Sequence, residues 1–146
     1  MPNCDIHISY MNIANEIAKR SYAVRLKVGA LLVKNNMIIS DGYNGMPYGF
    51  DNCCETDGIT NAEVLHAESN AITKIAKSPS SSDGSSLYVT ISPCLECAKL
   101  IIQSGIKSVY FDIRYRNLTG LKLLQIANIN VFEKDQKYNV FCEYIE

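Results

Sequence analysis

Residues 86–132 read SLYVTISPCLECAKLIIQSGIKSVYFDIRYRNLTGLKLLQIANINVF, and three short apolar runs in this stretch alternate with two longer amphipathic segments. Short apolar runs bounded by turn residues predict strands, and apolar residues at helical spacing predict helices. We expect strands at 86–91, 106–112 and 129–132 and helices at 94–103 and 118–127. This order favours parallel pairing, because parallel strands have to be joined by a crossover segment.

The preceding residues predict a hairpin, a long loop and two further helices. We expect antiparallel strands at 28–34 and 37–43, helices at 5–21 and 67–76, and a loop at 44–63. Lys34-Asn35-Asn36 reads as the hairpin turn, and Asp5 stands near the start of the first helix. A loop as long as 44–63 is typical of a lid or a binding segment. The pattern therefore predicts an α/β sandwich of about five strands, with helices covering the sheet.

Size, composition and charge narrow the class of protein. The 146 residues suit one domain, 1–146, in which the tail 135–146 remains unassigned and can dock on this subunit or a neighbour. A hydrophobic content of 47% is that of a globular protein, and a net charge of −1 gives no global field to recruit long nucleic acid. No secretory segment or membrane-length apolar run is evident, so we expect an intracellular, cytoplasmic protein without membrane contact.

Six cysteines in a reducing compartment are thiols or metal ligands before they are disulfides. Cys94 and Cys97 belong to Pro93-Cys94-Leu95-Glu96-Cys97, where Pro93 suits the first position of a helix. His66-Ala67-Glu68 opens the helix before it. One imidazole and two thiolates can hold zinc and leave a fourth position open for water, which is the layout of a catalytic zinc site. Glu68 is then free to move protons.

Other interpretations of these residues stay open. A Cys-x-x-Cys pair also occurs in redox proteins, although no thioredoxin-like start accompanies it here. A structural zinc needs a fourth ligand, which Cys53 or Cys54 could provide. Cys4 and Cys142 read as free thiols, and Cys53-Cys54 as packed thiols. The spacing His-x-Glu…Pro-Cys-x-x-Cys favours the first interpretation, because it is the pattern of zinc-dependent nucleobase deaminases.

The chain resembles the deoxycytidylate (dCMP) deaminase family of the cytidine deaminase superfamily over about residues 10–132. Besides the two zinc motifs, the matching stretches are Lys27-Val28-Gly29-Ala30, Gly42-Tyr43-Asn44-Gly45-Met46-Pro47, Asn52-Cys53-Cys54, Leu87-Tyr88-Val89-Thr90 and Gln103-Ser104-Gly105-Ile106-Lys107. The resemblance implies that the fold is a three-layer α/β/α sandwich with a mixed sheet. It also implies that the protein assembles as a homohexamer. It implies one Zn²⁺, since the extra cysteine of members with a second zinc is absent.

The resemblance also implies roles for individual residues. Its substrate-binding positions are Arg25 and Arg116 near phosphate, Asn44 at the sugar or base, the backbone of Ala67 and Ser92 at the pyrimidine edge, and Tyr115 stacked on the base. Its effector-binding positions are Gly42, Tyr43 and Gly45. Effectors of the family are dCTP with Mg²⁺, which activates, and dTTP, which inhibits. The arginines can equally be surface charges, Tyr115 a core residue, and the two glycines the ends of a turn.

The expected function is hydrolytic deamination of dCMP to dUMP for thymidylate synthesis. Glu68 would pass protons from water to the ring and to the leaving amino group. One alternative is a bifunctional dCMP/dCTP deaminase with the same site. A deaminase that edits tRNA or single-stranded DNA should show a basic stripe with exposed aromatic residues. The net charge of −1 argues against this class of deaminase. An alternative of another class is a non-catalytic zinc-binding module with four protein ligands.

Overall fold

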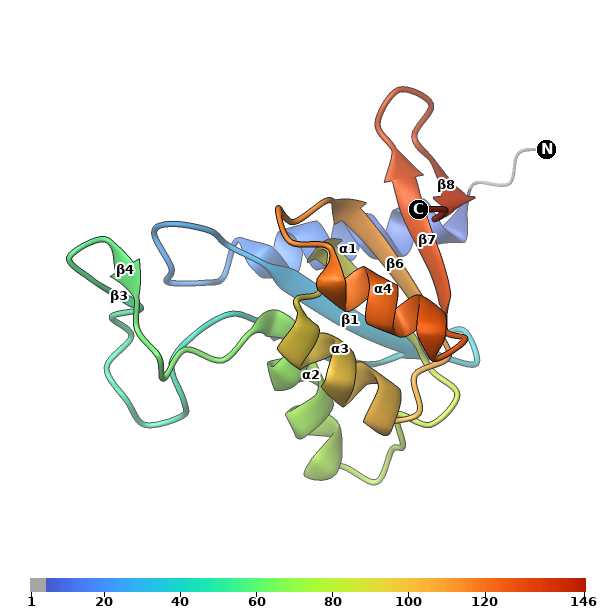
Figure 1. Cartoon of the computed structure of the whole chain (residues 1–146). Helices are drawn as coiled ribbons and strands as arrows, with labels where there is room; N and C mark the ends of the chain where they lie inside the picture. Colours follow the sequence, from blue (N-terminus) through green and yellow to red (C-terminus); the bar gives the residue numbers. More distant parts are fainter. Residues whose placement is uncertain (1–4) are drawn as a thin grey trace.

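The computed structural model describes residues 5–146 (Figure 1). Its elements are α1 (Ile6–Ala18), β1 (Gly29–Lys34), β2 (Met37–Tyr43), β3 (Glu55–Thr56), β4 (Ile59–Thr60), α2 (Ala67–Ala76), β5 (Ser86–Ile91), α3 (Leu95–Gln103), β6 (Ser108–Ile113), α4 (Thr119–Ile126), β7 (Asn130–Asp135) and β8 (Val140–Glu143). No helix within residues 5–146 has the length and hydropathy needed to cross a membrane.

The main sheet has six strands in the order β2-β1-β5-β6-β7-β8. The central strands β5, β6 and β7 are parallel, as the alternation of strands and helices predicts. The outer pairs, β2–β1, β1–β5 and β7–β8, are antiparallel. The sheet is therefore mixed, and the predicted fold class is confirmed.

Local chemistry explains the tight connections. Asn35 and Asn36 have φ angles of 52° and 59°, and they join Lys34 to its pairing partner Met37. Two residues at positive φ make the turn whose twist suits a hairpin, and asparagine tolerates this conformation well. At the other end of the chain, Asp5 caps α1, since its side chain accepts a hydrogen bond from the backbone N–H of His7.

Helices cover both faces of the sheet, so the molecule has three layers (Figure 1). On one face, α1 buries Met11 and Ala14 against an aromatic cluster that includes Tyr88 and Tyr110. On the other face, α2, α3 and α4 pack on the larger cluster of apolar residues. Ile6 and Ile13, two apolar residues within the predicted helix 5–21, are exposed. Met11 and Ala14 complete the buried face instead.

Three predictions about the elements are corrected. The sheet has six strands rather than about five, and 129–132 is not the last strand, because the tail returns as β8 and pairs with β7. Asp135 starts the connection by accepting hydrogen bonds from two backbone N–H groups, and Asn139 ends it at φ 54°. The expected loop 44–63 contains the small hairpin β3–β4, which projects away from the three layers (Figure 1).

Candidate active site

His66 and Glu68 lie at the N-terminus of α2. His66 is the N-cap residue in extended conformation, and Glu68 is in the first turn with only 4% of its surface exposed. The helix is held on β2 at Gly42, where a Cβ atom would lie 2.4 Å from the carbonyl oxygen of Ala67. Only glycine permits this close approach. The position of the imidazole and the carboxylate therefore depends on direct contact between a helix and a strand backbone.

Cys94 and Cys97 lie at the N-terminus of α3. Cys94 is its N-cap residue, and Cys97 is buried within the first turn. Pro93 therefore precedes the cap. The sequence predicted Pro93 as the first helical residue, but Cys94 after it is still extended, with ψ 174°. Gly120 of α4 packs on this segment, since a Cβ there would lie 2.2 Å from the carbonyl oxygen of Pro93.

The two helix starts bring one nitrogen and two sulfur atoms together. Nδ1 of His66 lies 3.3 Å from Sγ of Cys97 and 3.4 Å from Sγ of Cys94, and the three ligand atoms are within 4.8 Å of one another. Tetrahedral zinc with bonds of about 2.1 Å to nitrogen and 2.3 Å to sulfur separates its ligands by roughly 3.5 Å. Within residues 5–146 no fourth His, Cys, Asp or Glu joins this group. The donor set and its spacing fit zinc.

Proton affinities at the site are shifted by burial and by hydrogen bonds. Burial raises the pKa of Glu68 to about 6, opposed by a hydrogen bond to its own backbone and by the nearby His66. Hydrogen bonds with the Cys97 thiol and with His66 lower the pKa of Cys94. The hydrogen bond to Cys94 raises the pKa of His66. The pair of thiols thus favours a thiolate, and thiolate is the form that binds metal.

A cavity of about 560 Å³ opens beside the metal-ligand cluster. His66, Glu68 and Cys94 line it, with apolar walls from residues such as Val28, Val64 and Ile91. The cavity is also lined by every residue to which the resemblance assigns substrate binding: Arg25, Asn44, Ala67, Ser92, Tyr115 and Arg116. Six positions between residues 25 and 116 are therefore brought to one cavity.

Asn44 uses its side chain to hold backbone. Its Oδ1 accepts a hydrogen bond from Val28 N at 2.9 Å, and its Nδ2 donates to Leu26 O at 2.7 Å. Its own carbonyl accepts a hydrogen bond from the Ser21 hydroxyl at 2.7 Å. Asn44 thus fastens the segment before β1 to the end of β2, while it also faces the cavity.

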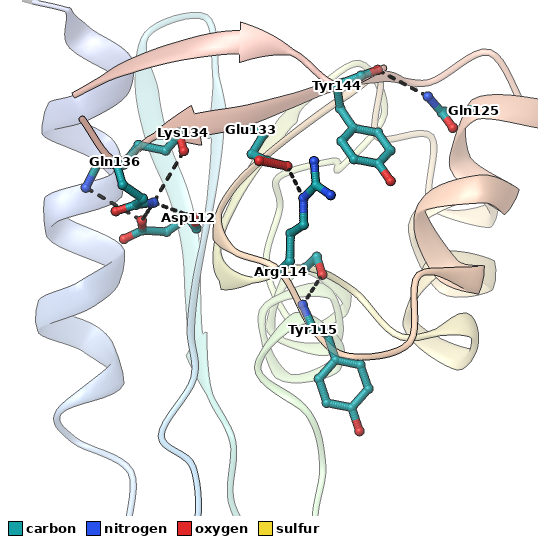
Figure 2. A network of polar contacts seen from close by, with 9 residues as sticks. Asp112, Arg114, Tyr115, Gln125, Glu133, Lys134, Gln136 and Tyr144 are labelled. Atoms are coloured by element: carbon teal, nitrogen blue, oxygen red, sulfur yellow. Dashed lines mark hydrogen bonds and ion pairs between the residues drawn. The ribbon is translucent and has the colours of Figure 1, made fainter. Parts of the chain in front are cut away.

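Tyr115 lies on the loop after β6, and its backbone N–H donates to the hydroxyl of Ser92 at 2.7 Å. Figure 2 shows the phenol ring extending away from the Arg114 side chain, which points the opposite way. Nε of Arg114 donates to Glu133 at 2.6 Å, and its guanidinium lies 5.3 Å from the ring centre of Tyr144. Strand β7 and the chain after β8 therefore fix the loop that carries Tyr115.

Arg25 and Arg116 are exposed at the cavity, and neither forms an ion pair with any residue from 5 to 146. The guanidinium of Arg116 lies 5.7 Å from the ring centre of Tyr115. Arg114, by contrast, is bound to Glu133. Glu55 and Thr60, which no sequence motif singled out, line the same cavity from the β3–β4 hairpin and bind the segment of Arg25.

The structure does not bring the predicted effector residues Gly42, Tyr43 and Gly45 into the cavity wall. Gly42 seats α2, and Gly45 forms a two-hydrogen-bond bridge with Leu65. These contacts are structural, so effector binding at these positions stays a prediction.

The remaining cysteines lie outside the metal-ligand group. Cys54 is buried in the cavity wall, whereas Cys53 is exposed, so only one of the pair is a packed thiol. Cys142 is a free, exposed thiol. Cys4 lies outside the described residues.

Comparison with known proteins identifies the family of this site. The family model of the cytidine and deoxycytidylate deaminase zinc-binding region matches residues 5–113. Deoxycytidylate deaminase of Enterobacteria phage T4 is 35% identical in an alignment 171 residues long, gaps included, which spans 87% of this chain and 89% of that protein. The Homo sapiens deoxycytidylate deaminase is 43% identical in an alignment 115 residues long, gaps included, which spans 70% of this chain and 61% of the human protein.

A solved structure has the same fold. The dCMP deaminase of cyanophage S-TIM5, crystallised with dCMP and dUMP, superposes with a TM-score of 0.87 and 45% identity over 91% of this chain and 99% of that one. This chain belongs to the cytidine and deoxycytidylate deaminase family.

Proposed function

We propose that this protein is a zinc-dependent enzyme that hydrolyses dCMP to dUMP and ammonia, and so supplies dUMP for thymidylate synthesis in the cytoplasm. The observation that carries the proposal is the position of a buried carboxylate, Glu68, beside the His66, Cys94 and Cys97 cluster in a cavity that Arg25 and Arg116 also line. The solved relative that contains dCMP and dUMP supports the choice of substrate and product.

His66 Nδ1 and the sulfur atoms of Cys94 and Cys97 would hold the zinc ion. When bound, zinc supplies Lewis-acid chemistry that makes water a nucleophile near neutral pH. The remaining steps depend on Glu68. Its carboxylate takes the proton of the attacking water and delivers a proton to N3 of the cytosine ring. After water has added to C4, Glu68 carries the proton of the new C4 hydroxyl to the amino group, the C4–N bond breaks, and ammonia leaves as the C4 carbonyl of dUMP forms.

The cavity walls would bind the two ends of the nucleotide. Tyr115 would stack its aromatic ring on the face of the base. The backbone of Ala67 and Ser92 would form hydrogen bonds with the edge of the pyrimidine. Arg25 and Arg116 offer planar forks of N–H donors that match phosphate oxygens. Asn44 would contact the sugar or the base while it holds the loop. The positive charges of Arg25 and Arg116 at the phosphate end favour a nucleotide over a nucleoside.

Regulation and assembly belong to the proposal as well. By family likeness the enzyme would be a homohexamer, with dCTP and Mg²⁺ as activator and dTTP as inhibitor. Gly42, Tyr43 and Gly45 form the segment that would respond to the effector. This response would reach the site through Gly42, because that residue contacts the first turn of α2.

A substrate panel tests the proposed reaction. Purified protein with measured zinc content is incubated with dCMP, dCTP and deoxycytidine, with and without added dCTP or dTTP, and ammonia release is followed. We expect turnover of dCMP well above that of deoxycytidine. Comparable turnover of dCTP would instead establish the bifunctional enzyme. Absence of ammonia release from every cytosine compound in zinc-loaded protein would contradict the proposal.

The role of Arg116 can be measured separately. Arg116→Ala should lower kcat/KM for dCMP roughly 10- to 100-fold, because a hydrogen bond to a charged group contributes about 1.5–3 kcal/mol. Deoxycytidine, which has no phosphate, should lose far less. Lys107→Ala is a matched control, since Lys107 is a basic residue outside the cavity lining. An equal loss on dCMP and deoxycytidine would show that Arg116 does not bind phosphate.

A further inference from the structure

The hairpin β3–β4 and the segment 21–28 meet at the rim of the cavity. This inference rests on the proposed function and concerns the phosphate end of the substrate. We propose that Glu55, assisted by Thr60, is a positioning residue that fixes Arg25 for phosphate binding and so sets the preference for nucleotide over nucleoside. Neither residue need touch the substrate in this role.

Glu55 binds the backbone on which Arg25 stands. A single carboxylate oxygen, Oε2, accepts hydrogen bonds from Val24 N at 3.0 Å and from Arg25 N at 3.1 Å. Hydrogen bonds to a carboxylate are shorter and stronger than those between neutral groups. Two consecutive N–H groups directed at one oxygen fix the orientation of the peptide between them. The direction in which the Arg25 side chain leaves the backbone is thereby fixed.

Thr60 binds the other end of the same side chain. Nη1 of Arg25 donates to the Thr60 hydroxyl at 3.2 Å. Glu55 and Thr60 are direct partners across the β3–β4 pair. One small hairpin therefore holds both the backbone and the guanidinium of Arg25. Holding a long side chain in its binding geometry before the ligand arrives removes part of the entropy cost of binding.

Packing alone would not fix the tip of this segment. Its ends are fastened through Asn44, which binds Ser21, Leu26 and Val28. At the tip, the side chain of Val24 is 85% exposed, and Arg25 is exposed as well. Few apolar contacts hold such a tip, so its conformation depends on hydrogen bonds. Among the described residues, Glu55 and Thr60 provide those that involve Val24 and Arg25.

The arrangement also keeps the charge of Arg25 available. Glu55 binds the backbone N–H groups and forms no ion pair with the guanidinium. Thr60 is neutral, and its hydroxyl engages only one of the five guanidinium N–H groups. The remaining donors can bind phosphate. A carboxylate placed on the guanidinium would instead compete with the phosphate for the same donors.

Steady-state kinetics with dCMP and deoxycytidine test the proposal. Glu55→Ala should raise KM for dCMP about tenfold and change kcat by less than about twofold. Its kcat/KM for deoxycytidine should stay within about twofold of wild type. Glu55→Gln should restore most of the affinity, since an amide oxygen still accepts both hydrogen bonds. Glu63→Ala is the matched control, because Glu63 is exposed and forms no hydrogen bond or ion pair with the described residues.

A double variant separates positioning from a direct role. Arg25→Ala should raise KM for dCMP, and adding Glu55→Ala to it should raise KM little further, because Glu55 acts through Arg25. Independent, additive losses would overturn the proposal. So would an unchanged KM in Glu55→Ala, or equal losses on dCMP and deoxycytidine. If thermal melting and zinc content show that Glu55→Ala does not fold, Glu55→Gln and Thr60→Val replace it in the test. We expect a near-normal KM for dCMP in Glu55→Gln and a moderately raised KM in Thr60→Val.

Wild-type protein distinguishes failure of this inference from failure of the proposed function. If wild type deaminates dCMP, and the ratio of kcat/KM for dCMP to kcat/KM for deoxycytidine is the same in Glu55→Ala as in wild type, only the positioning role is contradicted. If zinc-loaded wild type releases ammonia from no cytosine compound, the proposed function itself is contradicted.

Discussion

Glu68→Ala is expected to bind zinc as wild type does and to lower kcat for dCMP by at least about 10²- to 10⁴-fold. The carboxylate lies next to the metal-ligand group but is not one of its three ligand atoms. It is 4% exposed, and burial raises its pKa to about 6. A group of this proton affinity can both accept and return a proton near neutral pH. Since Glu68 serves several steps, its removal should affect all of them.

Metal analysis and ammonia release on the same sample check this result. Glu68→Gln is the isosteric companion, which keeps the volume of the side chain and removes its ability to carry the proton. Glu96→Ala on the exposed side of α3 is the matched control and should retain activity, because within residues 5–146 the Glu96 carboxylate pairs only with Lys99, on the surface. Loss of zinc from Glu68→Ala would make Glu68 a ligand, and retained turnover would exclude it as the proton carrier.

Cys97→Ala is expected to lose both zinc and activity. Cys97 is the most buried of the three ligand residues, and Nδ1 of His66 lies 3.3 Å from its sulfur. Two remaining ligands would hold the metal weakly, because structural and catalytic zinc sites use at least three protein ligands. Metal that binds only the folded state also stabilises it. The melting temperature should therefore fall toward that of wild type treated with a chelator.

Zinc content per chain, ammonia release and thermal melting measure the effect. Cys53→Ala is the control, since Cys53 is exposed and lies outside the ligand group. It should keep zinc and activity. If Cys97→Ala retained a full equivalent of zinc, the three-residue site assigned here would be wrong.

The metal-ligand group could be predicted from the sequence because its residues belong to two short motifs. A histidine and a glutamate two residues apart, and two cysteines three apart, each lie in one helix start, and few functions need that combination. The order of strands and helices was equally visible, since the apolar runs have the right lengths. The parallel centre of the sheet follows from that order alone.

Contacts between distant segments could not be read from the sequence. Glu55 binds Val24 and Arg25 thirty or more positions away, and nothing in its immediate sequence distinguishes it from a surface glutamate. Asn44 resembles a substrate contact, yet both ends of its amide hold backbone. Strand β8 left a weak signal, because its residues are mostly exposed. Asp135 and Asn139, which bracket its turn, were the clue available.

The link from Arg114 to Glu133 and Tyr144 (Figure 2) joins the end of the chain to the loop that carries Tyr115. Glu133 and Tyr144 both lie beyond the region 5–113 that the family model matches. If Tyr115 stacks on the base as proposed, divergence among relatives after residue 113 would change how tightly the base is bound and leave the zinc motifs unchanged.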